Sequence, residues 1–177
     1  SEASALDKCR FSVIPVPYEK TTSYIKGTAK GPAAIIEASS QVELWDEEVK
    51  RETWKLGIHT FPAVNCRGSE AAAFARITKA ARQAARLKAI PFFLGGEHSI
   101  TQALLPPFIE KHKNLSILHI DAHADLRPEY EGSRRNHACA LHPASRTNRL
   151  VQAGIRSVSE DEARFTNSGK VTTLFLH

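Results

Sequence analysis

Apolar residues gather in short runs along the chain, and turn-rich or amphipathic segments separate these runs. The segments 11–16, 90–94, 115–120, 150–155 and 171–176 are rich in Val, Ile, Leu and Phe, which predicts β-strands. The two middle runs, 90–94 and 115–120, are continuous enough to predict buried strands. The segment 70–88 is rich in Ala, Arg and Gln, which predicts an amphipathic helix. Strands that alternate with helices are typical of an α/β fold with a parallel sheet.

Proline and serine residues suggest where two further helices begin. Pro32 suits the first residue of a short helix over 33–39, because proline has no N–H to leave unpaired there. Ser99 is the expected cap of a helix over 100–112. We expect Pro106–Pro107 to kink that helix or to end part of it.

The composition is that of one folded domain. With 177 residues, of which 42% are apolar and 24% charged, the chain is large enough to bury a hydrophobic core. No repeat or linker divides it, so we expect residues 1–177 to form a single α/β domain. The chain contains no methionine, and no closing helix follows the last expected strand. We therefore expect it to be the N-terminal part of a longer fold.

The chain has a formal charge of +5 at pH 7, which raises the question of a nucleic-acid or membrane partner. Lys and Arg are scattered among acidic residues and do not alternate with aromatic residues, so we expect a solvated surface and no nucleic-acid partner. The apolar runs are too short to cross a bilayer, so we expect no membrane partner. Three cysteines without a CxxC spacing are typical of a reduced chain, and we expect a cytoplasmic location.

Two polar segments stand at the ends of neighbouring expected strands. GGEHS covers 95–99 and DAHAD covers 121–125, and they directly follow the runs 90–94 and 115–120. Two parallel strands joined by a right-handed crossover end at the same edge of a sheet, where open α/β folds bind their ligands. We therefore expect His98 to approach the DAHAD side chains.

DAHAD has the spacing of a metal-binding segment. Asp121, His123 and Asp125 lie at positions i, i+2 and i+4, so in an extended segment their side chains point to one side. Together with His98 they form a donor set that suits Mn²⁺, Zn²⁺ or Fe²⁺. A carboxylate such as Asp121 can bridge two metal ions, and the lowered pKa of the water between them supplies a nucleophile. We predict these four residues as metal ligands.

Two neighbouring residues receive other interpretations. We expect Glu97 to orient His98, and an ordinary polar loop residue is the alternative. His119 lies in the middle of an apolar strand, where we expect a hydrogen-bonded core histidine and not a ligand.

These motifs carry a resemblance to a known family. GGEHSI at 95–100 and DAHADLR at 121–127 resemble the first two signature motifs of the ureohydrolase family, which contains arginases and agmatinases. The segment 16–39 resembles the N-terminal strand, loop and helix of that family. YEGSRRNHACAL at 130–141 and VQAGIRS at 151–157 resemble the agmatinase branch more than the arginase branch. The resemblance implies an arginase-like fold, with three α/β/α layers around a parallel sheet.

The resemblance also implies a reaction and the residues that perform it. It implies hydrolysis of agmatine to putrescine and urea, a step of polyamine biosynthesis, by a metal-bridging hydroxide at a binuclear manganese centre. His98, Asp121 and Asp125 would bind one Mn²⁺, and His123 with the bridging Asp121 would bind the other. His137 matches a family histidine that shuttles protons, and an exposed loop histidine is the alternative. The implied partners are a small cationic guanidino substrate and further copies of the chain in a homo-oligomer.

One family motif has no counterpart in this chain. The third motif of the family supplies two further aspartates in an SxDxDxxDP-type segment, but after Asp125 this chain contains only Asp161, in a context typical of a helix start. One alternative to an agmatinase is an arginase or another amidinohydrolase of guanidino compounds. Another is a truncated, inactive chain that acts as an interaction or regulatory subunit. A basic RNA-binding fragment is a third alternative.

Overall fold

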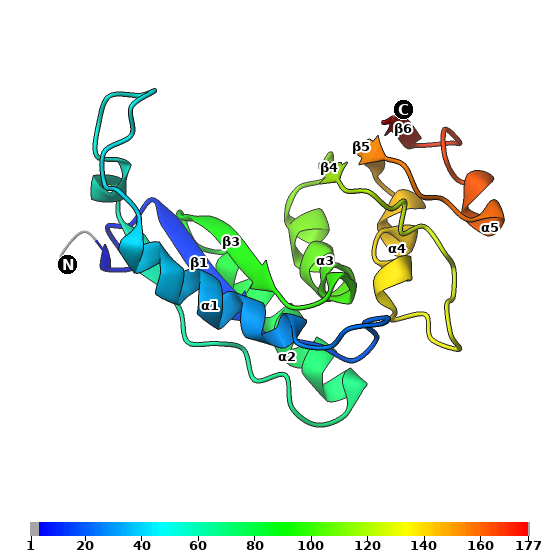
Figure 1. The fold of residues 1–177 in the computed structure, drawn as a ribbon, viewed down its shortest axis with the longest axis horizontal. Coiled ribbons are helices and arrows are strands. Elements are labelled where there is room, and N and C mark those ends of the chain that lie inside the picture. Colours follow the sequence, from blue (N-terminus) through cyan, green and yellow to red (C-terminus); the bar gives the residue numbers. More distant parts are fainter. Residues whose placement is uncertain (1–3, 177) are drawn as a thin grey trace. The chain divides into compact units, whose positions relative to one another are not determined.

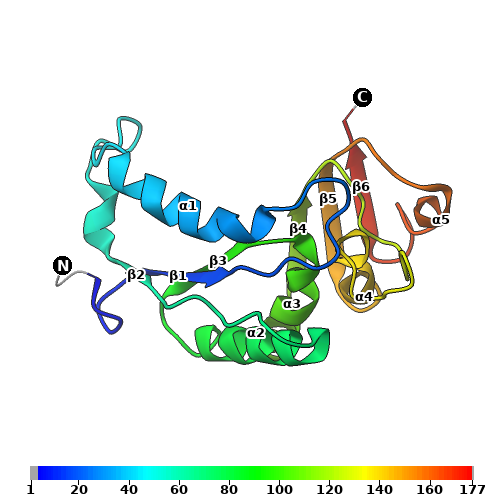
Figure 2. The same ribbon diagram turned by 60° about the horizontal axis from the view of Figure 1, so that its bottom comes forward.

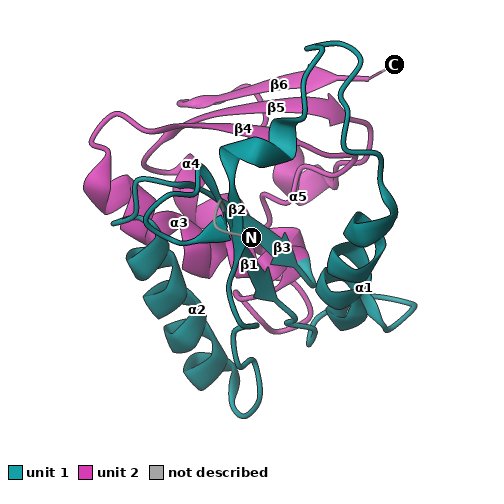
Figure 3. Ribbon diagram, turned by 90° about the vertical axis from the view of Figure 1, so that its left-hand side faces the viewer, with its two compact units in different colours: residues 1–97 teal, residues 98–177 magenta. Residues whose placement is uncertain are grey.

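The computed structural model describes residues 4–176 and divides the chain into two compact units. Residues 1–97 form the first unit and residues 98–177 the second (Figure 3). Each unit contains a three-stranded parallel sheet with helices, so the predicted parallel α/β class is confirmed. The single domain over 1–177 stays a prediction. Within the described residues, no helix combines the length and apolar character that crossing a membrane requires.

The first sheet is built around the first strand of the chain. β1 (Phe11–Val16) lies between β2 (Ile58–Thr60) and β3 (Ile90–Gly95), and the three strands, which Figure 3 labels, run parallel. β1 and β3 each contain six residues and pair along their whole length. The GGEHS segment therefore begins at the edge of the sheet where β1 also ends.

Two helices cover opposite faces of the first sheet. α1 (Gly31–Ala38) carries the predicted Pro32 in its first turn. α2 (Glu70–Ala84) begins after Ser69, whose hydroxyl accepts a hydrogen bond from the backbone N–H of Ala72. Its buried side chains recur at helical spacing and are Ala73, Phe74, Ile77, Ala81 and Ala84. The strands lie between α1 and α2 in Figure 2, which gives the first unit three layers.

The second unit contains the other sheet, with its strands in the order β4-β5-β6. α3 precedes β4, and the short helices α4 and α5 precede β5 and β6 (Figure 1). The bounds are α3 Thr101–Lys111, β4 Ser116–Ile120, α4 His142–Ser145, β5 Arg149–Ile155, α5 Glu160–Ala163 and β6 Val171–Phe175. The strands predicted from the last three apolar runs are therefore present. We expected β3 and β4 to end at the same edge of one sheet. This expectation is wrong, because β3 and β4 belong to different sheets.

One face of the second sheet is packed and the other is exposed. Leu150 of β5 joins a hydrophobic core that also contains Leu126 and Leu141. On the opposite face, Leu118 and Ile120 of β4 are 65% and 77% exposed. The expectation of a buried strand over 115–120 is therefore wrong for alternate residues, because successive side chains of a strand point to opposite faces and only one face is packed. The expectation is also wrong for the run 90–94, where Ile90 and Phe92 of β3 are 47% and 51% exposed.

The expected cap of the helix after GGEHS is also wrong. Ser99 lies inside a 3₁₀ turn, η5 (His98–Ile100), which leads directly into α3. The chain is therefore already helical at Ser99, and Ile100 takes the cap position without a side-chain hydrogen bond. Pro106 and Pro107 lie within α3, which continues to Lys111.

Candidate metal centre

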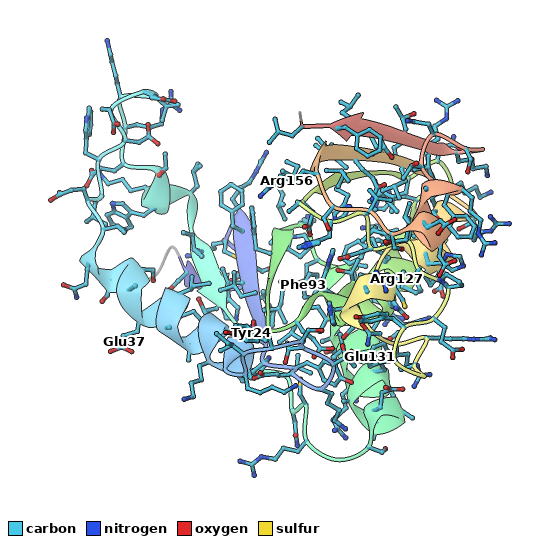
Figure 4. The ribbon with its side chains drawn as sticks, turned by 45° about the vertical axis from the view of Figure 1, so that its right-hand side comes forward. Tyr24, Glu37, Phe93, Arg127, Glu131 and Arg156 are labelled. Atoms are coloured by element: carbon cyan, nitrogen blue, oxygen red, sulfur yellow. The ribbon has the colours of Figure 1, made fainter. Side chains whose placement is uncertain are left out.

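The DAHAD segment extends β4 and is held in place by the end of β5. The backbone N–H of Asp121 donates to the carbonyl of Ala153, and the N–H groups of Arg156 and Ser157 donate to the carbonyl of Ala122. Figure 4 labels Arg156, which directly follows β5. These bonds fix the backbone at Asp121 and Ala122 before any side chain contributes.

Three of the four predicted ligands come together. His98 Nδ1 lies 2.6 Å from Asp125 Oδ2 and 3.6 Å from Asp121 Oδ2. Asp125 is buried, while His98 and Asp121 keep about a third of their side-chain surface exposed. With His119 they form a group whose ligand atoms all lie within 4.8 Å of one another. His98 thus meets the DAHAD carboxylates, as the sequence predicts.

The other two predicted site residues are placed differently. The side chain of His123 is 64% exposed, and its Nδ1 lies 3.5 Å from Asp121 Oδ1. It is outside the four-residue cluster, but near enough to share the carboxylate of Asp121. His137 is half-buried at the start of a 3₁₀ turn, η6 (His137–Cys139), beside the ring of Tyr130. The roles of both residues stay predictions.

His119 is the residue of the cluster that the sequence reasoning did not assign to the site. It is buried and hydrogen-bonded, as we expected of a core histidine. Its Nε2, however, lies 3.2 Å from Asp121 Oδ2. Residues i and i+2 of a strand share a face. The spacing of His119 and Asp121 could therefore have indicated that His119 lies beside the predicted ligand.

The electrostatics favour an ionised Asp121 beside a neutral His119. Burial raises the pKa of Asp121, but the backbone N–H of His123 and the imidazoles of His119 and His98 outweigh it and hold the pKa below its usual range. Burial, followed by the nearby His98, lowers the pKa of His119. At neutral pH the centre therefore presents a carboxylate and an uncharged imidazole.

Unusual backbone conformations support the two aspartates. Asp125 has a φ of 50°, in the left-handed region, and its carbonyl accepts a hydrogen bond from the backbone N–H of Leu141. Gly154 has a φ of 87°, and a Cβ there would lie 3.3 Å from the carbonyl oxygen of Asp121. Glycine is therefore required at the point where β5 passes the first ligand.

Glu97 has partners within the first unit. Its buried carboxylate accepts hydrogen bonds from the backbone N–H groups of Lys20 and Thr21, at 2.5 and 2.6 Å, and from the hydroxyl of Thr21 at 2.6 Å. These bonds hold the loop that follows β1. Its expected action on His98 stays a prediction.

Glu162 fixes the chain where it leaves the DAHAD segment. This buried carboxylate accepts from the backbone N–H of Leu126 at 2.9 Å, and from the N–H and hydroxyl of Ser159 at 2.9 and 2.8 Å. The Nε of Arg127, labelled in Figure 4, lies 3.5 Å from it. One side chain therefore caps α5 and anchors the residue after Asp125.

We expect Glu162→Ala to lower the free energy of unfolding by about 2–4 kcal/mol, because it leaves buried N–H groups without their acceptor. Urea unfolding followed by circular dichroism measures the change. Glu160→Ala, an exposed neighbour in the same helix, is the matched control and should change stability by about 0.5 kcal/mol or less. Equal unfolding midpoints for the two variants would contradict the anchoring role.

The donor set of the cluster fits a divalent metal ion. The imidazole of His98 and the carboxylates of Asp121 and Asp125 offer nitrogen and charged oxygen ligands, which Mn²⁺, Fe²⁺ and Zn²⁺ all accept. Gly154 and the hydrogen bond from the N–H of Leu141 position the backbone of Asp121 and Asp125, and hydrogen bonds from His119 and the N–H of His123 orient the carboxylate of Asp121.

A profile of the arginase family matches residues 9–177, which include both motifs and the whole cluster. The chain belongs to the arginase family. This membership agrees with the ureohydrolase resemblance of the two motifs and with the parallel sheets and helices described above. It also places the His/Asp cluster in a family of metal-dependent hydrolases.

Relatives within the arginase family are longer than this chain. It is 33% identical over 173 residues to an N(1)-aminopropylagmatine ureohydrolase from Thermus thermophilus, a match that covers 97% of this chain and 59% of the relative. An agmatinase from Pyrococcus horikoshii is 30% identical over 164 residues, covering 91% and 56%. The crystal structure of the agmatine ureohydrolase of Thermoplasma volcanium matches with a TM-score of 0.86 and 26% identity, covering 96% and 58%. The chain thus spans little more than half the length of these arginase-family relatives.

Proposed function

We propose that the protein containing this chain hydrolyses agmatine to putrescine and urea, using two Mn²⁺ ions. The observation that carries the proposal is the cluster of His98, Asp121 and Asp125, which lies where the two motifs of an arginase-family member meet. Relatives that carry the names agmatinase and agmatine ureohydrolase support the substrate class.

Each residue of the centre receives a proposed task. His98, Asp121 and Asp125 are the proposed ligands of one ion, and His123 with Asp121 of the other. Metal ions held by these residues would lower the pKa of water and so would supply a nucleophile near neutral pH. His137 is proposed to hold and transfer a proton through its imidazole, whose ordinary pKa lies near neutrality.

A second substrate is favoured by a specific observation. Relatives from Thermus thermophilus and Synechocystis, at 33% and 35% identity, carry the name N(1)-aminopropylagmatine ureohydrolase. N(1)-aminopropylagmatine carries the same guanidinium group as agmatine on a longer amine, so the same hydrolysis applies to both substrates. Arginine is the weaker candidate, because its carboxylate demands a partner that agmatine does not need.

Release of urea tests the proposal directly. We expect the protein that contains this chain to release urea from agmatine or N(1)-aminopropylagmatine in the presence of Mn²⁺. We expect this activity to be lost when a chelator removes the metal. His98→Ala should abolish the release and lower the bound metal, while His112→Ala, an exposed histidine just after α3, should change neither. Bound metal without urea release from any guanidino substrate would instead favour the inactive interaction subunit.

Assembly and location complete the proposal. Leu44 and Trp45 are more than half exposed, which supports a homo-oligomer, and light scattering after size exclusion measures it. Cys9, Cys66 and Cys139 are free thiols, which supports a reducing compartment such as the cytoplasm.

A further inference from the structure

Three polar side chains lie side by side across the packed face of the second sheet. His119 of β4 is opposite Gln152 of β5, which is opposite Thr173 of β6. All three are buried, with exposed fractions of 7%, 0% and 6%. Buried polar groups need hydrogen-bond partners, so this row must satisfy itself or bind the neighbouring backbone.

The backbone carbonyl of Ala124 determines the orientation of the Gln152 amide. Gln152 Nε2 lies 2.6 Å from that carbonyl oxygen, which can only accept a hydrogen bond. The amide therefore points its NH₂ group toward Ala124, and its Oε1 accepts from the hydroxyl of Thr173 at 3.2 Å. The reverse orientation would place two acceptor oxygens against each other.

This orientation fixes the proton on the ring of His119. The second hydrogen of Gln152 Nε2 points to His119 Nδ1, 2.9 Å away, so Nδ1 accepts. A neutral ring then carries its hydrogen on Nε2, which lies 3.2 Å from Asp121 Oδ2 and donates to it. Nε2 has no lone pair left for a metal ion.

We propose that His119 is a positioning residue that holds the Asp121 carboxylate for metal binding and is not itself a ligand. The proposal rests on the proposed function, in which Asp121 binds both ions. Oδ2 accepts from His119, and Oδ1 accepts from the backbone N–H of His123 at 2.9 Å. Each oxygen is thus fixed by one donor and keeps a further lone pair, which is the arrangement that a bridging carboxylate requires.

The tautomer of His119 tests the network without any metal. The ¹⁵N chemical shifts of the imidazole in the metal-free, labelled chain should show hydrogen on Nε2. Hydrogen on Nδ1 would overturn the proposal. Gln152→Glu replaces the donor with a carboxylate that can accept from Nδ1, while Nε2 still faces the Asp121 carboxylate, so we expect both ring nitrogens to carry hydrogen in this variant. The wild-type measurement decides the question even if that variant does not fold.

Mn²⁺ binding separates a positioning residue from a ligand. His119→Gln keeps an N–H near the position of Nε2, so we expect nearly wild-type affinity and the same number of bound ions. His119→Phe removes the donor, and we expect the affinity to fall by about 10–100-fold without the loss of an ion. Loss of one ion in both variants would show that His119 is a ligand. If the wild-type chain binds no metal, the proposed metal centre fails, while the tautomer still decides the His119 hydrogen bond.

Discussion

Gly96→Ala is expected to destabilise the first unit by on the order of 4 kcal/mol or more. A Cβ at this position would overlap the carbonyl oxygen of Tyr18 and would lie 2.7 Å from the Tyr18 nitrogen and 2.9 Å from the carbonyl oxygen of Val16. All three are backbone atoms, so no side chain can rotate away, and the end of β3 would have to separate from the chain that follows β1.

Tryptophan fluorescence during urea unfolding measures this effect, because both tryptophans of the chain, Trp45 and Trp54, lie in the first unit. Gly31→Ala is the matched control. Gly31 has a helical φ of −52°, and a Cβ there makes only an ordinary contact of 3.6 Å, so we expect stability to change by about 1 kcal/mol or less. A Gly96→Ala chain with the wild-type midpoint would refute the close-packing explanation.

Asp121→Asn is expected to abolish high-affinity metal binding, with a larger loss than the 10–100-fold expected for His119→Phe. The carboxylate of Asp121 lies within 3.6 Å of ring nitrogens of His98, His119 and His123, so its charge is at the centre of the donor set. An amide of the same shape removes that charge and leaves the size of the side chain unchanged.

Metal content after dialysis, measured by mass spectrometry, reports this loss, and circular dichroism shows whether the fold persists. Asp161→Asn changes an exposed aspartate in α5 and should keep the wild-type metal content. If Asp121→Asn binds metal as tightly as Asp161→Asn does, Asp121 is not a ligand.

The fold was predictable wherever apolar residues form long runs. The predicted strands 11–16 and 150–155 match the bounds of β1 and β5 to within one residue. Both strands bury apolar side chains, and this burial is what the apolar runs in the sequence indicate. β2 and α4 were missed, because three and four residues are too few to show a period. The burial of both 90–94 and 115–120 was overestimated, since composition cannot tell which face of a strand is covered.

The site was predictable where its residues share a local motif. His98, Asp121 and Asp125 follow strand ends, and the structure brings them together. Gln152 and Glu162 support the centre from later segments, and nothing in their own surroundings in the sequence marks them. Gly96 of GGEHS has no left-handed φ, and glycine is required there because the backbone atoms of Tyr18 and Val16 lie too close for a Cβ.

The row formed by His119, Gln152 and Thr173 has a consequence for how the second sheet assembles. Sliding β5 by one residue against β4 would move Gln152 to the exposed face and bury Val151 or Ala153 against the imidazole, which would then lose its amide partner. A misaligned sheet would therefore contain a buried polar group without a hydrogen-bond partner, which would destabilise it. Strands with only apolar side chains on this face would not be destabilised in this way. These three side chains thus increase the free-energy difference between the native sheet and sheets with a shifted register.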